Sequence, residues 1–165
     1  TVIFDLTVAI EVGLVIACVL FMKRVMETTE ISVITDEIDP NKESDITVHE
    51  ENLMIPKGIE VYEINGPYFF GIATKFEETM TQLGDRPKVR IIRMRKVPFI
   101  DSTGIHNLTA LCEMSQKEKT TIILSGVNEN VHNVLEKAGF YELLGKENIC
   151  PNINVALERA KSLVK

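Results

Sequence analysis

The 165 residues, of which 45% are hydrophobic, can form one domain of ordinary size together with additional segments. The three cysteines are odd in number and show no C-x-x-C spacing, and the three histidines show no i, i+4 pair. These counts argue against a disulfide framework and against a metal site. The net charge of −6 arises mainly in residues 27–51, which carry nine acidic residues and one basic residue. We therefore expect a reduced, cytoplasmic setting with no metal and no cofactor, and an acidic linker in place of an acidic binding face.

The first predicted element is an apolar segment from Val2 to Met22, which Lys23 and Arg24 follow. About 20 apolar residues cross a bilayer as a helix, and basic residues just after such a helix favour a cytoplasmic C-terminal side. A signal peptide would carry its positive charges before the apolar region. The alternative is a buried helix of a soluble protein. If the segment spans a membrane, Glu11 should face a larger helical bundle, because a carboxylate exposed to lipid is costly.

A linker is predicted next, followed by a hairpin. Residues 27–52 show no sustained helical or strand period, and the globular part begins near Leu53. The period-two alternation of Ile59–Ile64 predicts a strand. The turn sequence at residues 65–67 then predicts a second strand at Tyr68–Ile72, paired with the first as a hairpin.

Alternating helices and strands are predicted for the remainder of the chain. They are a helix at Thr74–Leu83, a strand at Val89–Met94, a helix at Ser102–Lys117, a strand at Thr121–Leu124, a helix at Glu129–Ala138, a short strand around Ile149-Cys150 and a last helix from Ile153 to about Leu163. Gly139 stands where a helix-ending glycine is expected. A hairpin followed by βαβ units predicts an α/β fold, a small mixed sheet with helices packed on it.

The turn Asp101-Ser102-Thr103-Gly104 joins a predicted strand to a predicted helix. A helix N-terminus presents free N–H groups and the positive end of the helix dipole, so a phosphate there would be stabilised. Ser102 is therefore a candidate phosphorylation site or the centre of a partner-docking turn. The alternative is that Asp101 or Ser102 only caps the helix. A Ser102–His106–Asp101 triad is disfavoured because Asp101 precedes the serine and no G-x-S-x-G motif exists, so we expect no enzymatic activity.

A basic cluster lies just before this turn, formed by Lys88, Arg90, Arg93, Arg95 and Lys96. It is interpreted as a solvated strand edge or as a contact for an anion, a nucleotide or an acidic partner. Ser125 and Gly126, between a strand and a helix, are candidates for the same contact, although they lack the phosphate-loop pattern. Nucleic-acid binding is disfavoured, because no aromatic residues interleave with the charges.

The segment Val89–Ile105, which contains the turn, resembles the STAS domain. This module is shared by anti-sigma-factor antagonists and by sulfate permease (SulP) anion transporters. In the antagonist branch the serine after the aspartate is phosphorylated by a cognate kinase, and the resemblance carries that role to Ser102 with Asp101, Thr103 and Gly104 as its neighbours.

Two further stretches resemble the transporter branch. Phe4–Leu14 and Leu20–Arg24 are similar to the last membrane segment of SulP transporters, and Pro56–Pro67 and Phe69–Gly71 to the opening hairpin of their C-terminal STAS domain. The resemblance implies a membrane segment at residues 1–25, an acidic linker at 26–52 and a STAS domain at 53–165. It also implies a regulatory domain on the cytoplasmic side of the inner membrane, in a secondary transporter of sulfate, bicarbonate or small carboxylates.

The partners expected from this resemblance are the membrane domain of the same transporter, a second protomer, and a regulatory protein or kinase. A free-standing anti-sigma-factor antagonist switched by serine phosphorylation is the alternative.

Overall fold

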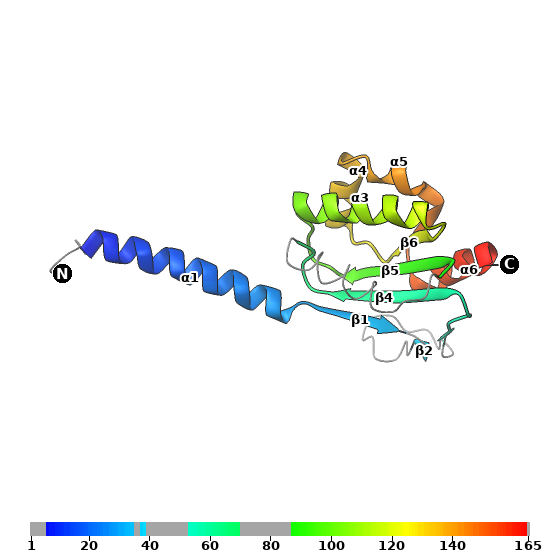
Figure 1. Cartoon of the computed structure of the whole chain (residues 1–165), viewed down its shortest axis with the longest axis horizontal. Coiled ribbons are helices and arrows are strands. Elements are labelled where there is room, and N and C mark those ends of the chain that lie inside the picture. The colour runs from blue at the N-terminus through cyan, green and yellow to red at the C-terminus, as the bar shows by residue number, and fades with distance from the viewer. Residues whose placement is uncertain (1–5, 35–36, 39–52, 70–86, 165) are drawn as a thin grey trace.

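A five-stranded sheet forms the centre of the domain, and one long helix extends away from it (Figure 1). The computed structural model describes residues 6–34, 37–38, 53–69 and 87–164. The strands, in spatial order, are β1 (Glu30–Ile34), β4 (Ile59–Asn65), β5 (Val89–Lys96), β6 (Thr121–Ser125) and β7 (Ile149–Cys150). β1 is antiparallel to β4, and the other neighbours are parallel. A separate two-stranded sheet pairs β2 (Glu37–Ile38) with β3 (Leu53–Met54).

Helices cover both faces of the five-stranded sheet. One face carries α3 (Ser102–Lys117), α4 (Glu129–Lys137) and α5 (Phe140–Leu144), and the other carries α6 (Ile153–Val164), while a short 3-10 turn, η2 (Lys146–Asn148), leads into β7. Successive strand residues point to opposite faces. Val61 therefore joins the core beneath α6, whereas Tyr62 joins the core beneath α3, α4 and α5.

The predicted fold class and most of the predicted elements are confirmed. α3 has the predicted bounds, and β6, α4 and α6 each differ from prediction by one residue at one end. Gly139 follows α4 with a φ of +71°, a left-handed conformation that glycine adopts easily. The helix predicted at Thr74–Leu83 lies outside the described residues.

The predicted hairpin after β4 is wrong for the residues that the structure describes. β4 already pairs with β1 on one side and with β5 on the other, so no edge is left for a hairpin partner. Tyr68 instead forms a parallel bridge with Ile100, beyond the end of β5. The Gly66 N–H donates to the Lys96 carbonyl at 3.2 Å, so the chain runs on beside β5 and does not fold back on β4.

The strand β1 lies inside the segment that was expected to be a linker. Its side chains reach both cores: Ile31 and Val33 pack against the core beneath α3, and Ile34 packs against the core beneath α6. The strand is short and its alternation is interrupted by acidic residues on either side, so its period is hidden in the sequence.

The helix α1 (Leu6–Thr28) contains a segment, Leu6–Val25, that is long and apolar enough to cross a membrane. None of that segment is buried, so the structure does not support the alternative of a soluble protein's core helix. Thr29 alone separates α1 from β1. It is fully buried, and its hydroxyl donates to the Val25 carbonyl at 3.2 Å.

Candidate functional site: the turn at the start of helix α3

Asp101 caps helix α3. Its backbone is extended, with φ −95° and ψ 175°, and its carboxylate accepts a hydrogen bond from the Gly104 N–H at 2.6 Å. Its own carbonyl accepts the first helical hydrogen bond, from the Ile105 N–H at 3.0 Å. The capping alternative is therefore realised by Asp101, and Ser102 is the first helical residue. Capping by Asp101 leaves Ser102 with its side chain exposed to solvent.

Gly104 lets helix α3 pass close to the segment after β4. A Cβ at this position would lie 2.5 Å from the Tyr68 carbonyl oxygen and 2.9 Å from Cγ1 of Ile100. The close approach that Gly104 allows is therefore that of the chain's own backbone at Tyr68 and of the Ile100 side chain. The glycine therefore fixes the position of the turn, and with it the position of Ser102.

The basic cluster does not form one surface. Arg90 points toward the α3 face, where its Nε lies 3.3 Å from Oε2 of Glu60 and its Nη1 lies 3.8 Å from Oε2 of Glu118. Arg93 points to the opposite face, where Nη1 lies 3.6 Å from Oε1 of Glu63. Both arginine side chains are 5% exposed. Both positions are therefore buried ion pairs across β4 and β5, and neither is placed to meet a ligand from solvent.

Lys96 and Arg95 lie at the end of β5, nearer the turn. Lys96 is about half exposed, and its Nζ lies 3.4 Å from Oε2 of Glu63. The backbone of Arg95 packs against Gly126, where an added Cβ would lie 3.2 Å from Cβ of Arg95. Lys88, at the opposite end of the strand, donates to the Val164 carbonyl at 3.3 Å.

At the Ser125-Gly126 candidate the chain contacts its own neighbouring strand β7. Ser125 is buried, and the Gly126 N–H donates to the Cys150 carbonyl at 3.0 Å. Asn128 is the residue that sequence reasoning missed here. Its Oδ1 caps helix α4 by accepting from the Val131 N–H at 2.9 Å, and its amide donates to the Val97 carbonyl. The cap is visible in the sequence as an asparagine before a helical period, but its tie to the loop after β5 is not.

The loop from Val97 to Ile100 was also missed. Val97 and Ile100 are buried, while Phe99 between them is 52% exposed. The loop is fixed at both ends, because the Val97 N–H donates to the Met94 carbonyl at 3.0 Å and the Phe99 carbonyl accepts from the Tyr68 N–H at 3.1 Å. Because hydrogen bonds hold the backbone of this loop, the fold itself exposes the Phe99 side chain, and fraying of the chain does not account for the exposure. No local sequence signal tells which of the apolar residues 97, 99 and 100 faces water.

A pocket of about 280 Å³ lies at the other end of the sheet, between α3, the start of β6 and the segment from α5 to η2. Its lining includes Cys112, Lys119, Thr120 and Asn148. Burial raises the pKa of the Cys112 thiol to about 12, so the thiol is protonated and a poor nucleophile near neutral pH. Among the described residues, no group of three or more His, Cys, Asp and Glu side chains is arranged to hold a metal ion.

The STAS domain family is the class that this fold and turn define. Its sequence model matches residues 52–156, which is more than half of the chain. The chain therefore belongs to the STAS domain family.

Relatives from sulfate transporters make the assignment more specific. The crystal structure of a sulfate transporter family protein from Wolinella succinogenes is 44% identical, with a TM-score of 0.65, and the match covers 68% of this chain and 92% of that one. YvdB of Bacillus subtilis, named as a sulfate transporter, is 26% identical over 149 residues, which is 90% of this chain and 26% of that protein. This chain is thus a STAS domain of the sulfate transporter (SulP) family.

The fold likeness extends beyond the domain itself. The structure of the murine Slc26a9 anion transporter in the inward-facing state is 22% identical, with a TM-score of 0.66, and the match covers 94% of this chain and 25% of that one. A match over 94% of this chain takes in part of α1 as well as the sheet. The chain spans about a quarter of the length of the curated relatives that it matches.

Proposed function

We propose that this chain is the cytoplasmic regulatory part of a SulP-type secondary transporter of sulfate, bicarbonate or small carboxylates. In this proposal α1 is the last membrane-spanning helix, and residues 26–165 lie on the cytoplasmic side of the inner membrane. The observation that carries the proposal is the direct joining of an exposed apolar helix to the edge strand of a STAS domain. The transport site would lie in helices that precede α1.

Charge placement supports this orientation. Lys23 and Arg24 stand at the end of the apolar segment, and both side chains are exposed. Basic residues beside a membrane helix are retained on the cytoplasmic side. Glu11 lies within the segment, and in the full transporter it would face neighbouring helices of the bundle.

The regulatory site of this proposal is Ser102 in the turn Asp101–Gly104. The serine is exposed at the first position of α3, where the helix dipole favours negative charge. A phosphate adds about −1.5 to −2 charges at neutral pH. The neighbouring Asp101 carboxylate already accepts a hydrogen bond from the Gly104 N–H. The charge of a phosphate on Ser102 would therefore act on a docked partner, either the membrane domain or a regulatory protein.

Anion uptake by the full-length transporter tests this role. We expect Ser102→Asp to change the uptake rate by about fivefold or more, as typical coupling energies imply, and Ser102→Ala to keep the unmodified rate. Ser162→Asp is the matched control, because Ser162 is also exposed but lies on α6. Identical uptake in wild type, Ser102→Asp and Ser162→Asp would contradict the regulatory role.

Fractionation of native cells tests the membrane assignment separately. An antibody to residues 53–165 should detect a band much heavier than 18.6 kDa in the inner-membrane fraction. A soluble band near 18.6 kDa would contradict the transporter assignment and favour a free-standing antagonist.

A further inference from the structure

We propose that the loop Val97–Ile100, with Phe99 at its exposed position, rests on the lipid headgroup surface of the membrane that α1 crosses. The proposal rests on the membrane-spanning role given to α1 above. It adds a defined lipid-contacting face to the STAS domain and assigns that face to the end of the sheet at which the parallel strands β4 and β5 finish.

The short connection between α1 and β1 fixes which edge of the domain faces the membrane. Thr29 is the single residue between them, and it is buried against Gly66 after β4, where an added Cβ would lie 2.6 Å from its hydroxyl. The connection is therefore too short to let the domain turn its opposite end toward the bilayer. Figure 1 shows β1 continuing along the line of α1, with the first turn of α3 on the side from which α1 enters.

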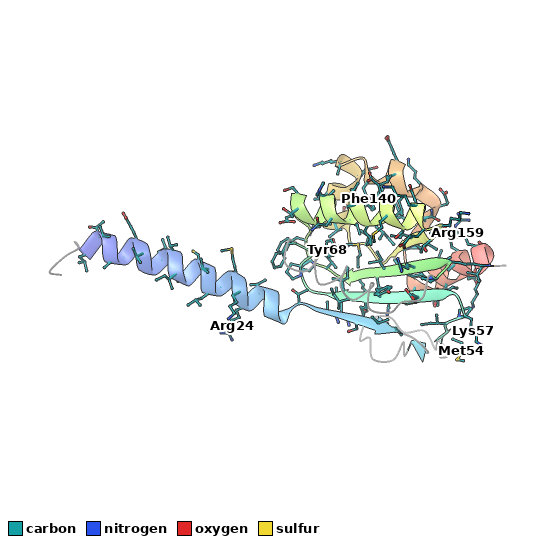
Figure 2. The ribbon with its side chains drawn as sticks, viewed as in Figure 1. Arg24, Met54, Lys57, Tyr68, Phe140 and Arg159 are labelled. Atoms are coloured by element: carbon teal, nitrogen blue, oxygen red, sulfur yellow. The ribbon has the colours of Figure 1, made fainter. Side chains whose placement is uncertain are left out.

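The strand register places the loop at the end of the sheet that is nearest to α1. Glu30 pairs with Asn65, and Asn65 pairs with Lys96, so the start of β1 and the ends of β4 and β5 lie at one level. From Val25 to Glu30 the chain advances about 11 Å if α1 is upright. The headgroup layer is about 5–8 Å thick on each side. Tyr68, which bridges Ile100, lies at the end of the domain near α1 (Figure 2), so the loop that carries Phe99 is at the end that faces the membrane and within reach of the headgroups.

The side chains on this loop suit a lipid surface. Phe99 is 52% exposed although the backbone on both sides of it is held by hydrogen bonds, and Pro98 beside it is also exposed. Lys96 is half exposed at the end of β5, and the cations Lys23 and Arg24 lie on α1, near the end of the helix that leads into the domain. Aromatic rings are enriched where hydrocarbon meets headgroups, and basic residues are attracted to anionic lipids of the cytoplasmic leaflet.

The opposite edge provides an internal control. Figure 2 shows Met54, Lys57 and Arg159 at the end of the domain remote from α1, whereas Tyr68, which bridges Ile100, lies at the end near α1. Met54 is 70% exposed and also apolar. Phe99 and Met54 are therefore both apolar and more than half exposed, and they lie at different distances from α1.

Single tryptophan reporters test the proposal, because the chain contains no tryptophan. The whole chain carrying Phe99→Trp or Met54→Trp would be reconstituted in vesicles of phosphatidylcholine with about 30% phosphatidylglycerol, an anionic leaflet like that of a cytoplasmic face. Phosphatidylcholine brominated on its acyl chains would then serve as the quencher. We expect the tryptophan at 99 to be quenched at least about twofold more than the one at 54, with blue-shifted emission, as for an interfacial aromatic residue.

Flotation of the vesicles separates the two ways in which the test can fail. If both variants float with the lipid but show equal quenching, the loop does not meet the headgroups and this inference is overturned, while the membrane role of α1 stands. Protection of residue 99 from aqueous quenchers without lipid quenching would point to a protein partner and would also overturn it. If neither variant floats, the membrane assignment of α1 fails and the inference fails with it. Circular dichroism matching that of the unmodified chain confirms that each variant is folded.

Discussion

At the scale of single residues, Gly104 shows how tightly the turn is held. We expect Gly104→Ala to destabilise the domain by about 1–3 kcal/mol, because the new methyl group meets backbone and cannot be accommodated by a rotamer change. The contact is the Tyr68 carbonyl, 2.5 Å from the added Cβ. A gain in helix propensity of about 1 kcal/mol offsets only part of this cost.

Urea unfolding in detergent, followed by circular dichroism, measures the effect. Gly13→Ala is the control, since a Cβ at Gly13 meets nothing within 4 Å. Equal unfolding midpoints for Gly104→Ala and the unmodified protein would show that Tyr68 and α3 can separate without cost.

The buried thiols make a prediction about chemical reactivity. Burial raises the pKa of Cys112 to about 12 and also raises the pKa of Cys150. A thiol loses its proton only as the pH approaches its pKa, so Cys112 stays neutral at pH 8. A rise of about three pKa units above an ordinary thiol lowers the thiolate fraction by about 1000-fold.

A thiol-specific reagent at pH 8 checks this prediction in a Cys18→Ser/Cys150→Ser variant, which leaves Cys112 alone. We expect labelling of the folded protein to be slower than labelling in urea by that factor or more, because access is restricted as well. Similar rates in the two conditions would mean that the helix α3 opens readily.

At the scale of elements, the join between β4, β5 and the end of α3 depends on Arg90. In β5 it is directly opposite Glu60 of β4, whose Oε2 also accepts from the Tyr62 hydroxyl at 2.8 Å. We expect Glu60→Ala to destabilise the protein by about 3–5 kcal/mol, because it leaves a buried guanidinium without its main counter-charge. Glu60→Ala combined with Arg90→Met should recover most of the loss.

Glu118 supplies a matched comparison on the same arginine. Its Oε2 lies 3.8 Å from Nη1 of Arg90, farther than Glu60 lies from Nε, and its side chain is 32% exposed. We expect Glu118→Ala to cost at most about 1 kcal/mol in the same chemical unfolding experiment. A loss of stability as large as that caused by Glu60→Ala would show that Glu118 stabilises Arg90 as much as Glu60 does.

At the scale of the whole molecule, β1 makes the STAS sheet complete. We expect a fragment of residues 53–165 to be less stable than a fragment of residues 30–165 by about 3 kcal/mol, from the loss of partly buried Ile31, Val33 and Ile34. The shorter fragment would also expose the edge of β4, which favours association between chains. Thermal unfolding and light scattering measure the two effects, and equal stability with a monomeric shorter fragment would contradict the prediction.

Elements whose signals lie within the element itself could be predicted from the sequence, whereas contacts between residues far apart in the chain could not. The helices α3, α4 and α6 and the strands β5 and β6 were predictable because their periods and end residues are local. The pairing of β1 with β4 is nonlocal, and a turn-like sequence at residues 65–67 predicted a hairpin that this pairing excludes. At the site, the Asp101 cap could be found from sequence. The burial of Arg90 and Arg93 could not, because it depends on Glu60 and Glu63 facing them across two strands.

The direct junction of α1 and β1 also has a mechanical consequence. Hydrogen bonds between antiparallel strands run perpendicular to the strands, and β1 continues along the line of α1. An axial pull on the helix therefore loads the five paired positions from Glu30 to Ile34 together, in shear, and does not peel them apart one at a time. A sliding or tilting movement of α1 would reach β4 as a displacement of the whole sheet, so the domain can follow the helix as a rigid body.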